Sequence, residues 1–438
     1  MEYIKNKQLF LLWVTIIVFL VFLFLPGNRL FLFNPSREIH IGEGFSGRTM
    51  DSLYDLNDLV IEMNNSQFVL LWESTHGTEE YYKIRKYISQ RLIKDYGFDF
   101  IAVEGDWSSI YKLNTYVKHI GDSSKTIQET MESLDRWPVW MWKNSVILEL
   151  AEWLREYNTN LPIEERVGFY GIDLYDANDS FEFIINTLTD SNLVENEPDD
   201  LKNCFQRFHN DFNNYPFFVY ETWRSCEIEI QDLISSVDIL DIRKKDDFLI
   251  QQNLWVLKNA EKHYRYQIYQ GHDSWNARAS HFASTVRNIE KYYWEGSRGI
   301  VWAHNTHVGD SSYILGAEDM LNIGKIMRED SEVFILGFVK NSGKVSAGSE
   351  WESEKYIMDI PPALEGSYGH LLANQRVSQA LFIFDKNRDW VEVMWHRAIG
   401  VTYDPLFETW NYVPTLISKR YDAIIFLNET SELLELNF

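Results

Sequence analysis

Acidic residues and histidines follow four apolar stretches of this sequence, and both residue types transfer protons in enzymes. In chain order these residues are Glu73, His76, Glu104, Asp173, His304 and His307. An imidazole accepts a proton from water near neutral pH, and a neighbouring carboxylate can hold its tautomer and stabilise the imidazolium. If the four stretches lie side by side, these groups would meet at one site. The sequence therefore predicts a hydrolase in which a histidine activates water.

His76 is the best candidate for the general base. Glu73 lies three residues before it, and Glu104 follows the second apolar stretch, so either carboxylate is placed to orient the imidazole. Arg85 lies about two turns into the segment after His76, where we expect a helix. A guanidinium at that position would steady the carboxylates or bind an anionic intermediate.

Other residues are candidates for contact with substrate. His304 and His307 flank Asn305 in the sequence HNTH, and their side chains would supply hydrogen-bond donors. Trp140 belongs to the tryptophan-rich stretch RWPVWMW, which either packs in the core or forms a wall of the site. Arg397 either contacts substrate or pairs with a buried acid. We expect Asn305, Trp140 and Arg397 to bind substrate.

Two other chemistries compete with a histidine base. The motif ExxH, the motif HxxH and Glu104 together supply two carboxylates and three imidazoles, which are enough ligands for zinc or manganese. The zinc-protease motif HExxH is absent, so we expect no cofactor and keep a divalent metal as the alternative. The serine-hydrolase elbow GxSxG is also absent. We therefore expect Ser74 to be a loop hydroxyl that bonds to backbone.

The apolar stretches have the pattern of strands in a parallel sheet. Residues 68–72, FVLLW, form a continuous apolar run, which is typical of a strand buried on both faces. In open parallel sheets ligands bind beyond the carboxyl ends of the strands, where the acidic residues and histidines would lie. Gly77 would give a turn, Thr78 would cap a helix, and residues 79–94 have the pattern of that helix. We expect an α/β fold with a central, mostly parallel sheet flanked by helices.

Other parts of the chain are assigned by the same patterns. Further strands are expected within residues 98–107, 166–176, 298–310, 333–338, 380–384 and 423–427. Residues 180–295 contain no strong strand pattern and include long helical stretches. We expect this segment to be a helical insertion that caps the carboxyl ends of the strands. Cys204 and Cys226 lie inside it and either form one disulfide or remain two buried thiols.

The N-terminus has the features of a membrane anchor. Residues 9–25 are almost entirely apolar, and this length is close to the lower limit for crossing a bilayer. Lys5 and Lys7 precede the segment, which favours an N-terminus inside the cell. No signal-peptidase site of small residues follows it. We expect a single-pass signal-anchor in residues 1–30 and an extracytoplasmic hydrolase domain in residues 31–438, with secretion after cleavage as the alternative.

The overall composition limits the possible partners. The chain has 438 residues, of which 41 are basic and 65 acidic, giving a net charge of −24. This balance argues against nucleic-acid binding, which needs a basic face, and disfavours docking on an anionic membrane surface. Aromatic residues make up 15% of the chain, and such residues often line clefts for bulky ligands. We expect a small-molecule ester or lactone as substrate. The alternatives are a metal-dependent hydrolase or peptidase and a non-catalytic envelope-binding protein.

Five motifs together resemble those of the erythromycin esterase family. They are ESTHGTEE with Arg85 nine residues after His76, VEGDW, GIDLY, WAHNTHVGD and RAIGVTY, and they occur in the family's order between residues 68 and 427. The resemblance implies an α/β protein with a helical insertion. It also implies a hydrolase of esters or lactones, because the family includes enzymes that open macrolide lactones.

The same resemblance assigns roles to individual residues. It implies that His76 is the general base and that Glu73 positions it. The residues that match the remaining active-site positions are Arg85, Glu104, His304 and His307. The resemblance also places Arg397 in a further family motif and implies hydrolysis without a metal.

Overall fold

The computed structural model describes residues 47–121, 125–190, 199–237, 240–269, 271–384 and 392–436 of the chain. These residues form a mixed α/β fold with a central sheet, as the sequence predicts. The signal-anchor predicted in residues 1–30 lies outside the described residues. None of the helices in the described ranges is both long enough and apolar enough to cross a membrane.

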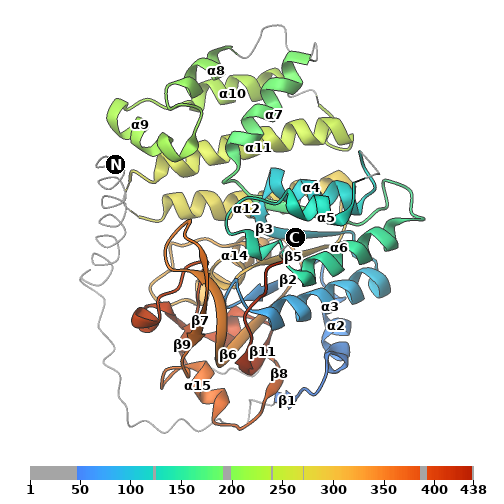
Figure 1. Ribbon diagram of the computed structural model, residues 1–438, viewed down its shortest axis with the longest axis vertical. Helices are drawn as coiled ribbons and strands as arrows, with labels where there is room; N and C mark the ends of the chain where they lie inside the picture. The colour runs from blue at the N-terminus through green and yellow to red at the C-terminus, as the bar shows by residue number, and fades with distance from the viewer. Residues whose placement is uncertain are drawn as a thin grey trace.

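Nine strands of the described residues form the central sheet, in the order β1-β8-β11-β6-β2-β5-β3-β4, with β7 paired to β6 (Figure 1). The strands from β11 to β4 in this order are parallel, whereas β1, β7 and β8 pair in antiparallel fashion. A separate pair, β9 (Met394–Arg397) and β10 (Tyr412–Thr415), forms a second sheet. The strands of the central sheet are β1 (Gly47–Thr49), β2 (Phe68–Glu73), β3 (Phe100–Asp106), β4 (Gly168–Asp173), β5 (Gly299–His304), β6 (Val333–Gly348), β7 (Lys355–Ile360), β8 (Gln379–Ile383) and β11 (Ala423–Thr430).

Strand β2 illustrates how the sheet is covered on both faces. Phe68, Leu70 and Trp72 pack into one hydrophobic core, and the alternating residues Val69 and Leu71 pack into another. The first core includes residues of α12 (Asp273–Tyr293), and the second includes residues of α3 (Glu79–Tyr96), α4 (Trp107–Val117) and α6 (Ser145–Asn158). A parallel strand covered on both faces has no solvent-facing side, which explains the continuous apolar pattern of β2.

A run of helices lies between β4 and β5. Figure 1 shows α7 to α11 stacked at the top of the molecule, with α12 next to the strands. The helices before α12 are α7 (Ala177–Asp190), α8 (Asp199–Gln206), η3 (Phe212–Asn214), α9 (Tyr215–Thr222), α10 (Glu227–Ser236) and α11 (Lys245–Tyr266). Cys204 of α8 forms a disulfide with Cys226, the residue before α10. Of the two states that the sequence leaves open for these cysteines, the structure has the disulfide.

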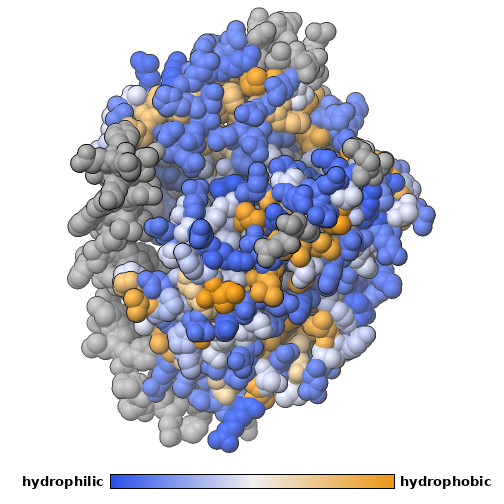
Figure 2. Space-filling model, viewed as in Figure 1, coloured by the Kyte–Doolittle hydropathy of each residue, from blue (hydrophilic) through white to orange (hydrophobic). Residues whose placement is uncertain are grey.

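Shorter helices connect the remaining strands. They are η1 (Leu53–Leu56), α2 (Asn57–Met63), α5 (Ile127–Glu132), η2 (Val139–Met141), α13 (Asn305–Val308), η4 (Ser311–Tyr313), α14 (Ile323–Arg328), α15 (Tyr368–Ala373), η5 (Pro405–Asn411) and α16 (Ile417–Arg420). The face of the molecule seen in Figure 2 is mainly hydrophilic, with smaller apolar patches between the polar residues.

The loop between β2 and α3 is held by the neighbouring strand β6. The backbone N–H of Ser346 donates to the carbonyl oxygen of Gly77 at 3.0 Å, and a Cβ at Gly77 would overlap the Ser346 carbonyl. Glycine is therefore needed here for a close approach of two backbones and not for a left-handed turn. Thr78 precedes α3, but its hydroxyl accepts from Nζ of Lys340 at 3.2 Å instead of capping the helix. The loop is thus fastened to β6 on its buried side.

Candidate active site

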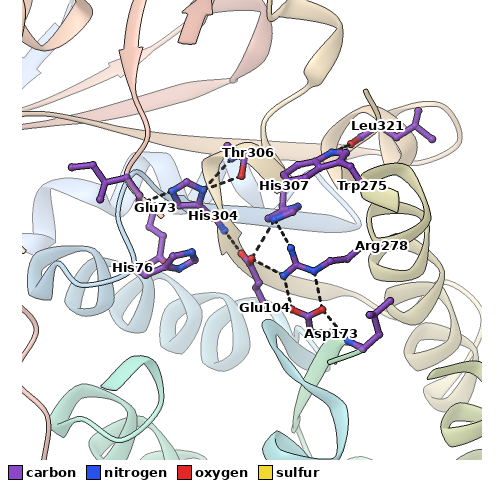
Figure 3. Close-up of polar contacts among 12 residues, drawn as sticks. Glu73, His76, Glu104, Asp173, Trp275, Arg278, His304, Thr306, His307 and Leu321 are labelled. Atoms are coloured by element: carbon purple, nitrogen blue, oxygen red, sulfur yellow. Dashed lines mark hydrogen bonds and ion pairs between the residues drawn. The ribbon is translucent and has the colours of Figure 1, made fainter. Parts of the chain in front are cut away.

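Four neighbouring parallel strands, β2, β5, β3 and β4, end at the same edge of the sheet. Glu73 and His304 are the last residues of β2 and β5, and they lie opposite each other in the register. Glu104 lies near the end of β3, and Asp173 ends β4. The four apolar stretches of the sequence are therefore adjacent in space, and their polar ends lie together (Figure 3).

These strand ends border a cavity of about 300 Å³. The acidic residues and histidines that line it are His76, Glu104, Asp106, Asp173, His304 and His307. Aromatic side chains form much of the remaining wall, and they are Trp137, Trp142, Tyr175, Trp275 and Trp351. Apolar walls with a few convergent polar groups are typical of sites that bind small molecules.

Glu73 holds the ring of His76. Nδ1 of His76 lies 2.8 Å from Oε1 of Glu73, and both side chains are buried. A carboxylate only accepts hydrogen bonds, so Nδ1 carries the proton and the lone pair lies on Nε2. Within the described residues Nε2 has no hydrogen-bond partner, and His76 lines the cavity. This nitrogen is therefore free to accept a proton from a bound molecule.

Arg85 stands behind Glu73 and does not line the cavity. Its Nη2 lies 2.6 Å from Oε2 of Glu73, and each of the two side chains is only 1% exposed. This contact is an ion pair without the alignment of a hydrogen bond. The guanidinium also lies over the rings of Tyr82 and Trp302, at 4.3 and 4.6 Å from their centroids. Arg85 thus positions Glu73 from below and has no access to a molecule in the cavity.

Both ring nitrogens of His304 are used inside the protein. Nε2 lies 3.0 Å from the carbonyl oxygen of Ile399, so it carries the proton, and Nδ1 accepts from the hydroxyl of Thr306 at 3.0 Å. Burial lowers the pKa of His304 well below its usual range, which keeps the ring neutral. The ring lies against that of His76, with centroids 4.7 Å apart. The donor to substrate expected at His304 is already bonded to the backbone.

Arg278 joins the acidic groups at the strand ends to His307 (Figure 3). Its Nε lies 2.9 Å from Oδ1 of Asp173, and its Nη2 lies 2.5 Å from Oδ2. Nη2 also contacts Oε1 of Glu104 at 3.2 Å, and Nη1 donates to Nε2 of His307 at 3.0 Å. The other oxygen of Glu104 accepts the backbone N–H of His304 at 2.6 Å. One guanidinium from α12 therefore ties together the polar ends of β3, β4 and β5.

Sequence patterns do not single out Arg278 as a site residue. It lies inside a long helix, far along the chain from any strand end, and only the packing of α12 on the sheet brings it to the cavity. Trp275, about one turn earlier, stacks on His307 with ring centroids 4.4 Å apart. Arg278 precedes the core residue Phe282 by four positions, which places it on the buried face of the helix. A charge on that face is the one signal that the sequence offers.

Burial and charge shift the titrations of these groups in different directions. Burial raises the pKa of Glu104 above its usual range. Burial has the same effect on Asp173, but the charge and hydrogen bonds of Arg278 outweigh it, and the pKa of Asp173 is lowered. Burial and the charge of Asp173 raise the pKa of Asp106 to about 7. Burial, followed by the charge of Arg278, lowers the pKa of His307 well below its usual range, so this ring is neutral.

Asn305 and Trp140, both expected to bind substrate, do not line the cavity. Asn305 begins α13 and is fully buried. Its side-chain amide points toward the backbone of β9, to which it donates at 3.2 Å. Trp140 is buried in the core, whereas its neighbours Trp137 and Trp142 reach the cavity. The tryptophan-rich stretch thus serves both as core packing and as a wall of the site.

Arg397, the third residue expected to bind substrate, also lies away from the cavity. Its Nη2 lies 2.7 Å from Oε1 of Glu408, and both side chains are buried. Two further bonds run from the guanidinium to backbone carbonyl oxygens. Arg397 therefore has the buried acidic partner that is the alternative to substrate contact.

The residues after Arg397 support the loop that carries His76. The carbonyl oxygen of Ile399 accepts from His304, and its N–H donates to the carbonyl oxygen of Ser74 at 2.9 Å. The hydroxyl of Ser74 lies 2.7 Å from that of Tyr81, so it bonds to a side chain and not to backbone. The motif RAIGV thus supports the site through hydrogen bonds of its backbone.

The acidic groups and His307 are arranged around a guanidinium. Among the described residues, no group of three or more His, Cys, Asp or Glu side chains is placed to hold a metal ion. Arg278 contacts two of the side chains that the sequence offers as metal ligands, Glu104 and His307, and it also binds Asp173. A guanidinium is permanently charged, so it supplies positive charge at this position at any physiological pH.

The sequence profile of the erythromycin esterase family matches residues 93–430. The chain belongs to the erythromycin esterase family. Membership in this family supports a hydrolase acting on esters.

Solved structures with the same fold include a succinoglycan biosynthesis protein, with a TM-score of 0.68 and 17% identity over 88% of this chain and 95% of that chain. A Bacillus cereus protein has a TM-score of 0.72 and 18% identity over 89% and 97%. An erythromycin esterase mutant in its open conformation has a TM-score of 0.63 and 16% identity over 90% and 100%. Identities this low establish a shared fold alone. The activity of this erythromycin esterase family member has to be inferred from its own site.

The ion pair beneath His76 yields a stability prediction. The substitution Arg85→Met leaves Glu73 buried without its cation, and loss of one partner of a buried pair costs about 3–5 kcal/mol. We expect urea unfolding to show this loss. Lys83→Met on the same helix is the control, because Lys83 is 54% exposed and its pair with Glu79 is worth less than about 1 kcal/mol. Equal stabilities of the two variants would contradict the assigned role of Arg85.

Stability should also depend on the buried histidines of the insertion. Burial lowers the pKa of His281 to about 4, so the unfolded chain binds a proton at higher pH than the folded chain. The contribution is intact above about pH 6.5 and is lost as the pH falls toward about 4. His281→Gln should therefore lose less stability than the wild type over that range in urea unfolding. His370→Gln in α15 is the control. If the free energy of unfolding of His281→Gln changes with pH as it does in the wild type, the assignment is contradicted.

Proposed function

We propose that this protein hydrolyses carboxylic esters or lactones with water that is activated by His76. The observation that carries the proposal is the His76 ring itself. Its Nδ1–H donates a hydrogen bond to a buried carboxylate. Its Nε2 faces the cavity and has no hydrogen-bond partner among the described residues. An imidazole held in one tautomer and open on the other side is the arrangement that a general base requires.

The reaction follows from this geometry. Water bound near Nε2 of His76 gives its proton to that nitrogen while its oxygen attacks the carbonyl carbon, and a tetrahedral oxyanion forms. Glu73 stabilises the imidazolium and is itself held by Arg85. The oxyanion then collapses, the bond to the alcohol oxygen breaks, and the imidazolium returns the proton to that oxygen. The products are a carboxylic acid and an alcohol, or one hydroxy acid from a lactone.

The walls of the cavity favour a bulky and largely apolar substrate. Five aromatic side chains surround the polar end of the site. Contact with aromatic walls removes apolar surface of the substrate from water, which stabilises the complex by roughly 25 cal/mol per Å². Esters or lactones with ring systems or long carbon skeletons would gain most from this contact.

We further propose that the reaction needs no metal. The positive charge between Glu104, Asp173 and His307 is already supplied by Arg278, which leaves these side chains occupied. A divalent metal bound by the same Glu and His groups is the competing proposal, and a peptidase activity would go with it. Strong chelators distinguish the two.

The substitution His76→Ala tests the mechanism. Loss of a general base costs roughly 10²–10⁴-fold in rate, so we expect kcat on an active ester to fall by that factor while the unfolding midpoint stays near that of the wild type. The measurement is hydrolysis of a panel of aryl esters and macrolactones by the full-length protein, with and without chelator. His370→Ala serves as the control. Near-wild-type rates in His76→Ala would refute the base, and loss of wild-type activity in chelator would favour the metal.

The N-terminal apolar stretch and the disulfide support a location outside the cytoplasm. We propose that residues 9–25 anchor the chain in the membrane and that the hydrolase domain lies on the outer side. Disulfides such as Cys204–Cys226 persist in oxidising compartments. We expect a protease added to intact, wall-free cells to degrade the domain. Degradation only after the cells are lysed would contradict this location.

A further inference from the structure

We propose that Arg278 is a catalytic residue whose guanidinium binds the oxyanion of the tetrahedral intermediate. The inference rests on the proposed hydrolysis and adds the group that stabilises its negative charge. Arg278 belongs to α12, the last helix of the run between β4 and β5, so these helices would supply chemistry as well as cover.

The other donors expected from the sequence are either engaged elsewhere or buried. Nδ1 of His307 carries the proton because Nε2 accepts from Arg278; this N–H has no partner among the described residues, but it is fully buried. Arg85 lies beneath Glu73, outside the cavity. The only N–H of the neutral His304 ring is given to a backbone carbonyl oxygen. Two of the indole N–H groups in the wall are also bonded, that of Trp137 to the carbonyl oxygen of Ser353 and that of Trp275 to the carbonyl oxygen of Leu321. Among the described residues that line the cavity, the arginines Arg136 and Arg278 remain as cationic donors.

Contacts place Arg278, and not Arg136, beside the base. Arg278 bonds to Glu104, whose other oxygen accepts the backbone N–H of His304. The ring of His304 in turn lies 4.7 Å from that of His76. Figure 3 shows Glu104 between His76 and Arg278. Arg136 instead extends from a surface loop to Asp106 and approaches the exposed Glu352 at 3.9 Å.

The guanidinium has one donor left for a substrate. Of its five N–H groups, that on Nε and one on Nη2 bond to Asp173, the other on Nη2 bonds to Glu104, and one on Nη1 bonds to His307. The second N–H of Nη1 has no acceptor among the described residues. A carbonyl oxygen held in the cavity beside His76 would find this donor as its charge develops.

The surroundings hold the guanidinium in one orientation. Asp173 binds it through both oxygens, and the rings of Tyr175 and Phe282 lie 4.8 and 4.7 Å from its central carbon. The side chain is 12% exposed, so water competes little for its charge. A donor that is already oriented costs no reorganisation when the oxyanion forms, which makes it effective in catalysis. Asp173 is in this account a positioning residue for Arg278.

The test compares Arg278→Ala and Arg278→Lys with Arg287→Ala in the full-length protein. Removal of one oxyanion donor lowers kcat by roughly 10²–10³-fold, so we expect a fall of this size in Arg278→Ala with KM little changed. Arg278→Lys keeps the charge without the planar fork, and we expect an intermediate kcat. Arg287 lies on the same helix and pairs with Glu290, and its removal should leave kcat unchanged. If Arg278→Ala does not fold, Arg278→Lys carries the test. A wild-type kcat in a folded Arg278 variant would overturn the proposal.

A binding measurement separates this proposal from the proposed function. Phenyl methylphosphonate is a tetrahedral anion that resembles the intermediate of phenyl acetate hydrolysis, and acetanilide is a neutral analogue of the ester. We expect calorimetry to show phosphonate affinity at least roughly tenfold weaker in Arg278→Ala, with acetanilide affinity little changed. Equal losses for both probes, or no loss for the phosphonate, would overturn the role of Arg278. A wild type that binds phosphonate through Arg278 but hydrolyses no ester would sink the proposed function alone.

Discussion

A buried carboxylate between an imidazole and a guanidinium, Glu73 between His76 and Arg85, is the contact on which the site depends. A charge buried without a partner costs several kcal/mol, so Glu73 can sit at this depth only because Arg85 lies behind it. The same carboxylate holds His76 in the tautomer that leaves Nε2 open to the cavity. The chemistry at the surface of the cavity therefore rests on an ion pair that never touches a ligand.

The parallel sheet turns this local contact into a site. Because β2, β5, β3 and β4 are neighbours with one direction, their carboxyl ends deliver acidic groups and imidazoles to a single edge. Two arginines from different helices then act at different depths. Arg85 from α3 neutralises Glu73 beneath the surface, and Arg278 from α12 binds Glu104 and Asp173 at the cavity. The charges of the site are thus balanced by the two layers of helices that enclose the sheet.

The walls of the cavity come from other parts of the chain than its polar end. Trp137 and Trp142 lie on either side of η2, Trp351 lies between β6 and β7, and Trp275 comes from α12. Connecting segments vary more readily than strands. This division would let the walls change without disturbing the polar end of the site. The substrate would then be selected mainly by the aromatic walls.

The sequence by itself determined seven strands of the central sheet and the acidic residues and histidines at the ends of four of them. It does not predict β1, β7, β9 and β10, and it leaves Glu73 and Glu104 as alternative partners of His76. The determined features are local, because a continuous apolar run specifies a strand covered on both faces and polar residues mark where it ends. Only the tertiary structure decided which candidates face the cavity. Asn305, Trp140 and Arg397 have the right residue types but are buried away from the cavity, and the N–H of His304 donates to a backbone carbonyl oxygen. Arg278 reaches the site because α12 packs on the sheet, and the spacing of motifs along the chain carries no record of such long-range packing.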